Sequence, residues 1–250
     1  MMRTDQVYRI ISNKEICAGY FEIKVAASAQ IVKACKPGQF FMISVPDAFL
    51  RRPISIHDAK NGVISFLYKV VGKGTKILSE IKSGELSMLG PLGNGYDMPK
   101  SINPVIIAGG TGIASVYFLA ASLKHKGVLY YGAKTTTDLL CMDKFKKLGW
   151  KVMVSTEDGS QGHKGLITEC ILNSSFLIPN SSLLYVCGPM PMMKAVMKIA
   201  EKNNMSGYAS LEEKMACGIG NCQGCAVKIN GENKMTCKDG PVFNIKDITL

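Results

Sequence analysis

The stretch Pro104-Val-Ile-Ile-Ala-Gly-Gly-Thr-Gly-Ile-Ala114 decides the class of fold, because an apolar run passes into a glycine-rich turn and then into more apolar residues. This order is typical of a buried strand, a tight turn and the start of a helix. Residues 101–123 carry no charge and are long enough to span a bilayer, so a membrane helix is an alternative. Pro104 and the glycines within the run favour the strand, turn and helix.

The same alternation continues along residues 99–207. Apolar strands are predicted at 104–110, 128–133, 150–156 and 182–187, and helices at 112–125, 138–149, 166–172 and 191–204. This alternation of strands and helices predicts an α/β domain with a parallel, doubly wound sheet. Two turns at the carboxyl ends of its strands are candidate nucleotide-binding turns, although plain packing also explains glycines there. Their residues are Gly109, Gly110, Thr111 and Gly112, and then Cys187, Gly188 and Pro189.

Residues 1–98 have a different rhythm of short strands and turns. The predicted strands are 7–11, 20–27, 40–45, 54–59, 63–71 and 85–89, and Asn61-Gly62 between two of them is a hairpin signal. An antiparallel β-barrel is the expected architecture. The glycine and proline cluster at residues 90–95 closes this domain.

Four of the nine cysteines lie in the last predicted unit, residues 208–250. The spacing from Cys217 through Cys222 and Cys225 to Cys237 is C-x4-C-x2-C-x11-C, which is typical of plant-type [2Fe–2S] ligands. Gly218 and Gly220 suit a loop wrapped closely around a cluster. A structural zinc site is the alternative, but zinc ribbons usually carry two short cysteine pairs.

Composition and charge exclude several classes of protein and of partner. The chain has 250 residues, 47% hydrophobic and 20% charged, which excludes disordered, collagen-like and coiled-coil classes. The formal net charge of +11 is spread without basic runs, so nucleic acid is not an expected partner. The N-terminal residues show no export signal, and we expect a cytoplasmic protein that is not bound to a membrane.

Arg51-Arg52-Pro53-Ile54-Ser55 opens a predicted barrel strand, where a guanidinium beside a hydroxyl is either a phosphate-binding pair or an ordinary exposed charge. Arg52-Pro-Ile-Ser55, Gly109-Gly-Thr-Gly-Ile-Ala114, Cys187-Gly-Pro-Met190 and the cysteine block followed by Lys238-Asp-Gly-Pro-Val-Phe243 occur in that order. Together they resemble the ferredoxin-reductase superfamily. Within it the chain is similar to the electron-transfer subunits of the two-subunit NAD-dependent dihydroorotate dehydrogenase, over essentially its whole length.

The resemblance implies FAD bound by the barrel, NAD bound by the α/β domain and a [2Fe–2S] cluster bound by the four cysteines. The implied FAD contacts are Arg52, Pro53, Ile54, Ser55, Leu67, Tyr68, Lys69, Gly74 and Thr75. This chain departs from the wider superfamily at Ile54, where a tyrosine is usual, and at Ser115, where many relatives have proline.

The function implied is electron transfer in pyrimidine biosynthesis, from dihydroorotate to NAD. The implied partner is a catalytic subunit that carries FMN, in a heterotetramer with two copies of each subunit, and this chain would hold no catalytic acid or base. A reductase subunit of another redox complex is the main alternative, and a zinc-stabilised nucleotide-binding regulator is a more distant one. Lys134 suits either NAD or NADP.

Overall fold

The computed structural model of the chain describes residues 4–100, 102–173, 178–179 and 181–249 and divides into two units. The first unit contains the described residues up to Tyr96 together with Glu212–Val227 and Glu232–Pro241. The second contains Asp97–Leu211, Lys228–Gly231 and the described residues from Val242 onward.

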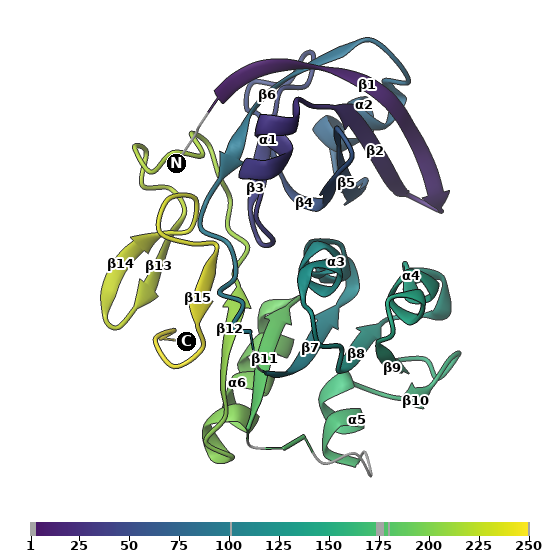
Figure 1. The fold of residues 1–250 in the computed structure, drawn as a ribbon, viewed down its shortest axis with the longest axis vertical. Helices are drawn as coiled ribbons and strands as arrows, with labels where there is room; N and C mark the ends of the chain where they lie inside the picture. Colours follow the sequence, from purple (N-terminus) through teal and green to yellow (C-terminus); the bar gives the residue numbers. More distant parts are fainter. Residues whose placement is uncertain (1–3, 101, 174–177, 180, 250) are drawn as a thin grey trace. The chain divides into compact units, whose positions relative to one another are not determined.

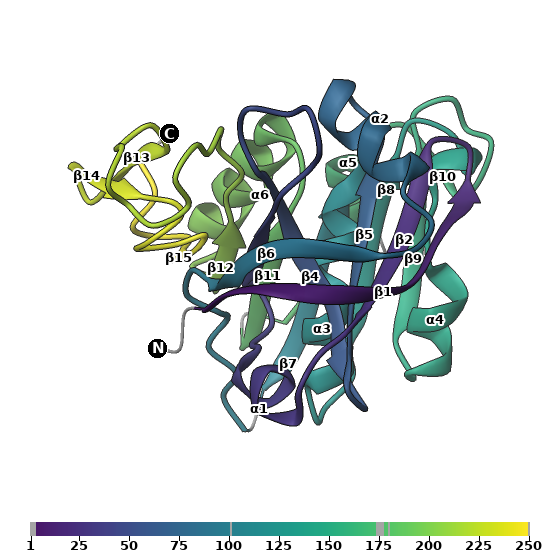
Figure 2. The same cartoon turned by 90° about the horizontal axis from the view of Figure 1, so that it is seen from above.

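The first unit is built on a closed six-stranded barrel, as the sequence predicts. All pairings in it are antiparallel, and the strand order is β1-β2-β5-β4-β3-β6 (Figure 2). The strands are β1 (Thr4–Cys17), β2 (Tyr20–Ala26), β3 (Phe40–Ile43), β4 (Arg52–Lys60), β5 (Val63–Lys69) and β6 (Glu85–Leu92). Two helices lie between them, α1 (Ala29–Ala34) and α2 (Lys73–Glu80).

Local chemistry explains the barrel's turns and core. Asn61 and Gly62 both have positive φ, 51° and 74°, which is what a tight hairpin turn requires, so the predicted hairpin between β4 and β5 is confirmed. Inside the barrel, the ring of Phe41 packs edge-on against Tyr8 and Phe66 at centroid distances of 5.9 and 5.6 Å. This aromatic core holds the strands that carry the candidate flavin residues.

The second unit is a seven-stranded sheet with the order β10-β9-β8-β7-β11-β12-β15 (Figure 1). Its strands are parallel except for the last pair, which is antiparallel. The bounds are β7 (Asn103–Gly109), β8 (Val128–Ala133), β9 (Lys151–Thr156), β10 (His163–Lys164), β11 (Ser182–Cys187), β12 (Ser206–Ser210) and β15 (Val242–Asn244).

Helices cover both faces of this sheet (Figure 1). On one face, Tyr117 of α3 (Ile113–Ser122) packs against Phe145 of α4 (Met142–Lys147) with ring centroids 5.4 Å apart. On the other, α5 (Ile167–Asn173) contacts α6 (Met190–Lys202). Single 3₁₀ turns, η1 (Gly110–Gly112) and η2 (Thr136–Asp138), precede α3 and α4.

The uncharged run considered as a membrane span forms β7, η1 and the ten-residue α3. In the part of the chain that the structure describes, no helix has the length and apolar character needed to cross a bilayer. The strand, turn and helix predicted from the quoted stretch are therefore present.

The C-terminal segment differs from the expected separate unit at 208–250. Its cysteine-bearing parts belong to the barrel unit, whereas β12 and β15 pair with each other in the sheet of the second unit. The short strands β13 (Ala226–Ile229) and β14 (Glu232–Met235) form a two-stranded sheet. The reason is apolar packing over long sequence distances: Cys225 and Cys237 share a buried cluster with three barrel side chains, Phe40, Met42 and Leu92.

Candidate cluster and cofactor sites

The four predicted cluster cysteines lie in the barrel unit and form two pairs of thiols. The Sγ atoms of Cys225 and Cys237 are 3.2 Å apart. The Sγ of Cys217 accepts a hydrogen bond of 3.5 Å from the backbone N–H of Cys222. Two pairs of cysteines are the ligand set of a binuclear iron–sulfur cluster, with four thiolates shared between two irons.

Backbone shape brings the first pair together. Gly218 and Gly220 have φ values of 71° and 90°, in the left-handed region that favours glycine. A Cβ on Gly218 would lie 2.6 Å from Cγ of Met42, so the loop also needs glycine to approach the barrel. This confirms the need for glycine at Gly218, on both backbone and steric grounds.

The electrostatic environment differs between the two pairs. Burial acts to raise the pKa of Cys217, but backbone N–H groups of Cys222, Ile219 and Asn221 outweigh it and hold the pKa at about 6. Burial raises the pKa of Cys237 to about 12, and its contact with Cys225 acts in the same direction. N–H groups directed at sulfur are what a thiolate-bound cluster requires.

Within the described ranges, no group of three or more His, Cys, Asp or Glu side chains is arranged to hold one metal ion. Thr236, beside Cys237, is 0% exposed, and its hydroxyl has no hydrogen-bond partner among the described residues. A buried hydroxyl without a hydrogen-bond partner is rare. Thr236 directly precedes Cys237 in sequence, and its backbone N–H donates to the carbonyl of Cys225.

Arg52 and the first turn of α2 form a second candidate site within the barrel unit. A Cβ on Gly74 would lie 2.1 Å from Nε of Arg52, so only glycine allows the guanidinium to lie against this turn. Arg52 donates to the carbonyl of Leu50, and no carboxylate pairs with it among the described residues. The guanidinium and the N-terminus of α2 both favour a negative charge beside them, so these residues fit a diphosphate.

Thr75 has a structural part in the same turn. Its hydroxyl accepts hydrogen bonds from the N–H groups of Val71 at 2.9 Å and Gly72 at 3.2 Å, and donates to the carbonyl of Gly72 at 3.0 Å. The hydroxyl therefore fixes the entry to α2, and the backbone N–H groups of its first turn remain for an anion.

The other candidate flavin residues lie on β4 and β5. Ile54 is buried, Ser55 is half-buried and Pro53 is exposed. On β5 the hydroxyl of Tyr68 donates to Asn13 at 3.1 Å, and burial raises its pKa to about 12. Leu67 is buried beside it, and Lys69 donates to the hydroxyl of Tyr20 at 2.8 Å.

The two candidate nucleotide turns meet at the carboxyl edge of the sheet in the second unit. They follow the neighbouring parallel strands β7 and β11, with Ala108 opposite Cys187. A Cβ on Gly112 would lie 2.3 Å from the carbonyl oxygen of Cys187, and a Cβ on Gly188 would lie 2.9 Å from the backbone nitrogen of Gly109. Glycine at these positions lets the two turns touch.

Ser115 and Cys187 link the same two turns. The Ser115 hydroxyl donates to the carbonyl of Gly112 and contacts Sγ of Cys187, both at 3.0 Å. Gly110 has a φ of 51°, and Thr111 is the exposed member of the turn. Pro189, at the other turn, precedes the first residue of α6. The serine that departs from the superfamily pattern thus makes contacts that proline would lack.

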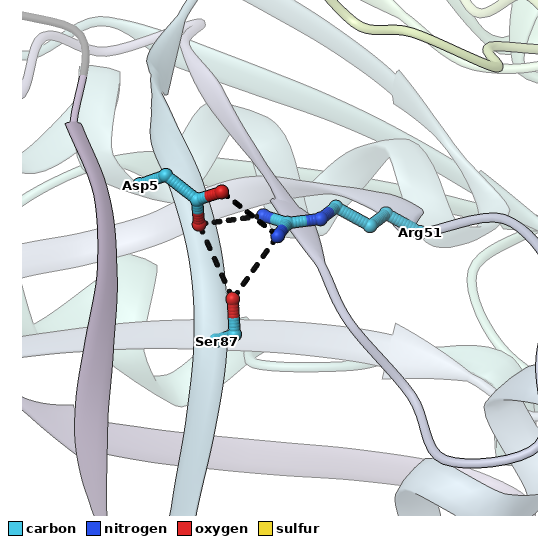
Figure 3. Close-up of polar contacts among 3 residues, drawn as sticks. All are labelled: Asp5, Arg51 and Ser87. Atoms are coloured by element: carbon cyan, nitrogen blue, oxygen red, sulfur yellow. Dashed lines mark hydrogen bonds and ion pairs between the residues drawn. The ribbon is translucent and has the colours of Figure 1, made fainter.

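A further group of polar residues on the barrel was not predicted. The guanidinium of Arg51 makes two hydrogen bonds of 3.0 Å to the carboxylate of Asp5 and a third of 3.0 Å to the hydroxyl of Ser87 (Figure 3). The Ser87 hydroxyl also donates to Asp5 at 3.2 Å. The arginine doublet was the only available signal, because Asp5 and Ser87 are distant from it in sequence.

Lys134, which the sequence suggests could suit either NAD or NADP, lies just after β8, and Asp158 lies just after β9. Lys134 is exposed, and its carbonyl accepts from the N–H of Asp158 at 3.3 Å. Hydrogen bonds from Ser160 lower the pKa of Asp158 and tie its carboxylate into its own turn. Asp158 therefore shapes this loop.

Comparison with protein families gives two matches. Residues 212–249 match the model described as the iron–sulfur cluster binding domain of dihydroorotate dehydrogenase B. Residues 106–198 match the model described as an oxidoreductase NAD-binding domain. The two matches fall on the cysteine segment and on the sheet with the two glycine turns.

Relatives match almost the entire chain. The chain is 40% identical to the dihydroorotate dehydrogenase B (NAD(+)) electron transfer subunit of Clostridium acetobutylicum, over 98% of this chain and 97% of that one. The subunit of the same name from Caldanaerobacter subterraneus is 39% identical, over 99% of both chains.

Solved structures share the fold. The NADH-dependent reduced ferredoxin-NADP oxidoreductase, studied for flavin-based electron bifurcation, superposes with a TM-score of 0.88 at 30% identity, covering 98% of this chain and 91% of that chain. A ferredoxin NADP+ reductase from Neisseria gonorrhoeae, with bound FAD and NADP, has a TM-score of 0.67 at 16% identity, covering 81% of this chain and 92% of that chain.

Proposed function

Because the chain belongs to the family of electron-transfer subunits of NAD-dependent dihydroorotate dehydrogenase B, we propose that it carries electrons between a catalytic subunit and NAD in pyrimidine biosynthesis. The cofactors are FAD, a [2Fe–2S] cluster and NAD. The single observation that carries the proposal is the arrangement of the four cysteines in the barrel unit, where Cys217 contacts Cys222 and Cys225 contacts Cys237. These cysteines lie in the segment that matches the family's cluster-binding domain.

The cluster residues have defined parts in this proposal. Cys217, Cys222, Cys225 and Cys237 hold the two irons. Backbone N–H groups around Cys217 stabilise negative charge on sulfur, as the lowered pKa of this thiol indicates. Phe40, Met42 and Leu92 keep water away from the buried pair, because they pack against Cys225 and Cys237.

The flavin residues position a dinucleotide on the barrel. Arg52 and the N–H groups at the start of α2 neutralise the diphosphate, and Gly74 allows the guanidinium to lie against this turn. The strand residues Pro53, Ile54, Ser55, Leu67, Tyr68 and Lys69 contribute the remaining contacts. When bound, FAD and the cluster connect two-electron hydride transfer with single-electron transfer.

The glycine turns of the second unit hold the nicotinamide dinucleotide. Gly109, Gly110, Thr111 and Gly112 present backbone N–H groups to the pyrophosphate, and Cys187, Gly188 and Pro189 form the facing turn. NAD is the proposed nucleotide, in keeping with the names of the relatives. As functional segments, we propose residues 1–98 for FAD, 99–207 for NAD and 208–250 for the cluster.

The proposed partner is a dihydroorotate dehydrogenase catalytic subunit with FMN, in a cytoplasmic heterotetramer with two copies of each chain. The relatives' designation as an electron transfer subunit supports a catalytic partner. We propose that the acid and base chemistry on dihydroorotate belongs to that partner.

The test is a reconstitution. The purified chain, loaded with FAD and cluster, should oxidise NADH with an artificial electron acceptor and should not oxidise dihydroorotate. Adding the FMN subunit should then couple dihydroorotate oxidation to NAD reduction. Reduction of NAD by dihydroorotate with this chain alone would contradict the proposed division of labour.

A second candidate is a reductase subunit of another redox complex. The 30% identity and TM-score of 0.88 with the NADH-dependent reduced ferredoxin-NADP oxidoreductase favour this candidate over a zinc-stabilised regulator. Co-purification separates the two electron-transfer candidates: an FMN protein that oxidises dihydroorotate supports the first, and a ferredoxin-dependent flavoprotein supports the second.

A further inference from the structure

Thr236 is a buried threonine whose hydroxyl lacks a hydrogen-bond partner among the described residues. The whole residue is 0% exposed. Valine has almost the same shape and no polar group, and it would fill this position without that cost. The hydroxyl therefore needs a hydrogen-bond acceptor that becomes available when the protein binds its cofactors.

The surroundings of Thr236 indicate which acceptor that is. Its backbone N–H donates to the carbonyl of Cys225 at 3.0 Å, and it directly precedes Cys237 in sequence. Both cysteines are buried, at 2% and 1% exposure, and their Sγ atoms are 3.2 Å apart. The backbone of Thr236 is thus fixed beside both members of the buried thiol pair, by a hydrogen bond to Cys225 and a peptide bond to Cys237.

Metal binding changes what these sulfurs can accept. A protonated thiol is a weak acceptor, whereas a thiolate bound to iron carries negative charge and accepts hydrogen bonds well. A threonine hydroxyl reaches neighbouring groups by rotation about a single bond between staggered positions. Iron binding therefore makes the sulfurs of the buried thiol pair stronger hydrogen-bond acceptors.

We propose that Thr236 donates its hydroxyl hydrogen bond to a sulfur of the cluster at the Cys225–Cys237 pair and thereby raises the cluster's reduction potential. This inference rests on the proposed function, since it needs the cluster. Hydrogen bonds to sulfur stabilise the reduced cluster, which carries one more negative charge, so they raise the potential. Thr236 is a tuning residue, and the four cysteines remain the ligands.

The experiment is a potentiometric titration of the purified full-length chain, followed by EPR of the reduced cluster. Thr236→Val removes the hydroxyl and keeps the shape. At the wild-type midpoint, the ratio of reduced to oxidised cluster should fall about three- to tenfold. This corresponds to about 30–60 mV, at ~59 mV per decade for one electron.

Three further variants make the result specific to the hydroxyl. Thr236→Ser should keep the wild-type potential, and Thr236→Ala should lower it, so this smaller pair repeats the comparison if Thr236→Val does not hold the cluster. Met235→Leu alters packing against the buried side chains around Cys225 and Cys237 without changing a hydrogen bond. This variant should leave the reduction potential unchanged.

Equal potentials in both comparisons, Thr against Val and Ser against Ala, would overturn the inference. So would a shift in Met235→Leu as large as that in Thr236→Val, because packing would then be the cause. In both cases the cluster signal would still support the proposed function. A wild-type chain without any iron–sulfur signal would instead overturn the proposed function itself.

Discussion

Arg51 contacts both carboxylate oxygens of Asp5 at 3.0 Å, so the residue before β4 is tied to the first strand of the barrel (Figure 3). The next residue is Arg52, whose guanidinium lies against Gly74 at the start of α2. Adjacent arginines therefore have different tasks: the first fixes the backbone, and the second is available for an anion.

The contact between Arg51 and Asp5 should affect flavin binding indirectly, because it positions the neighbouring Arg52. A partly exposed ion pair contributes about 0.2–1 kcal/mol, so Arg51→Ala should weaken FAD binding by up to about fivefold and lower the melting temperature slightly. Flavin binding is measured by fluorescence titration of the FAD-depleted protein. Lys60→Ala, which removes the exposed ion pair with Asp58 on the same strand, is the matched control and should not change FAD affinity.

Arg52 should have a larger effect because it is the proposed phosphate ligand. A hydrogen bond to a charged group contributes about 1.5–3 kcal/mol, so Arg52→Ala should reduce FAD affinity by one to two decades. The readout is flavin content after dialysis. Arg9→Ala removes an exposed arginine elsewhere on the barrel and should keep its flavin, and unchanged content in Arg52→Ala would place the diphosphate elsewhere.

Gly112→Ala should impair nucleotide binding. The added Cβ would lie 2.3 Å from the carbonyl oxygen of Cys187, so the two turns would have to separate. We expect the KM for NADH to rise at least about tenfold, the effect of ~1.4 kcal/mol in binding. FAD and iron content serve as internal controls, because their proposed ligands lie in the other unit, and an unchanged KM would show that close contact of the turns is not needed.

Cys222→Ala should abolish the EPR signal of the reduced cluster, since it removes one of four thiolates. Cys35→Ala is the control. Cys35 is a buried cysteine of the barrel unit that lies outside the C-x4-C-x2-C-x11-C segment, so removing its thiol should leave the cluster in place. A full-strength signal in Cys222→Ala would contradict the ligand assignment, and a lost signal in Cys35→Ala would point to general unfolding.

Local patterns predicted much of the fold. The Asn61-Gly62 turn and the glycine-rich turn after β7 depend on neighbours in sequence, and both appear where the pattern places them. The contact between Arg51 and Asp5 joins residues 46 positions apart, and no local rule predicts it. The division of residues 208–250 has the same origin, because side chains from distant barrel strands decide where Cys225 and Cys237 are buried.

The candidate sites were predictable to different depths. The spacing of cysteines indicated the ligand set, and the structure adds how the thiols pair. For Thr75 the resemblance implied an FAD contact, and the structure adds that its hydroxyl holds the turn before α2. Thr236 gave no signal, since its distinguishing feature is a buried hydroxyl without a hydrogen-bond partner among the described residues, and only the structure shows this.

The divided C-terminal segment limits how the molecule can be cut. The chain passes from one unit to the other after Tyr96, Leu211, Val227, Gly231 and Pro241. A protease nick at one connection leaves the other four intact, but it divides the chain into two fragments that only non-covalent contacts hold together. A truncation after residue 207 would remove the cluster ligands, most of β12 and all of β15. The cysteine segment therefore cannot be deleted or transferred as a separate domain without exposing an edge of the sheet.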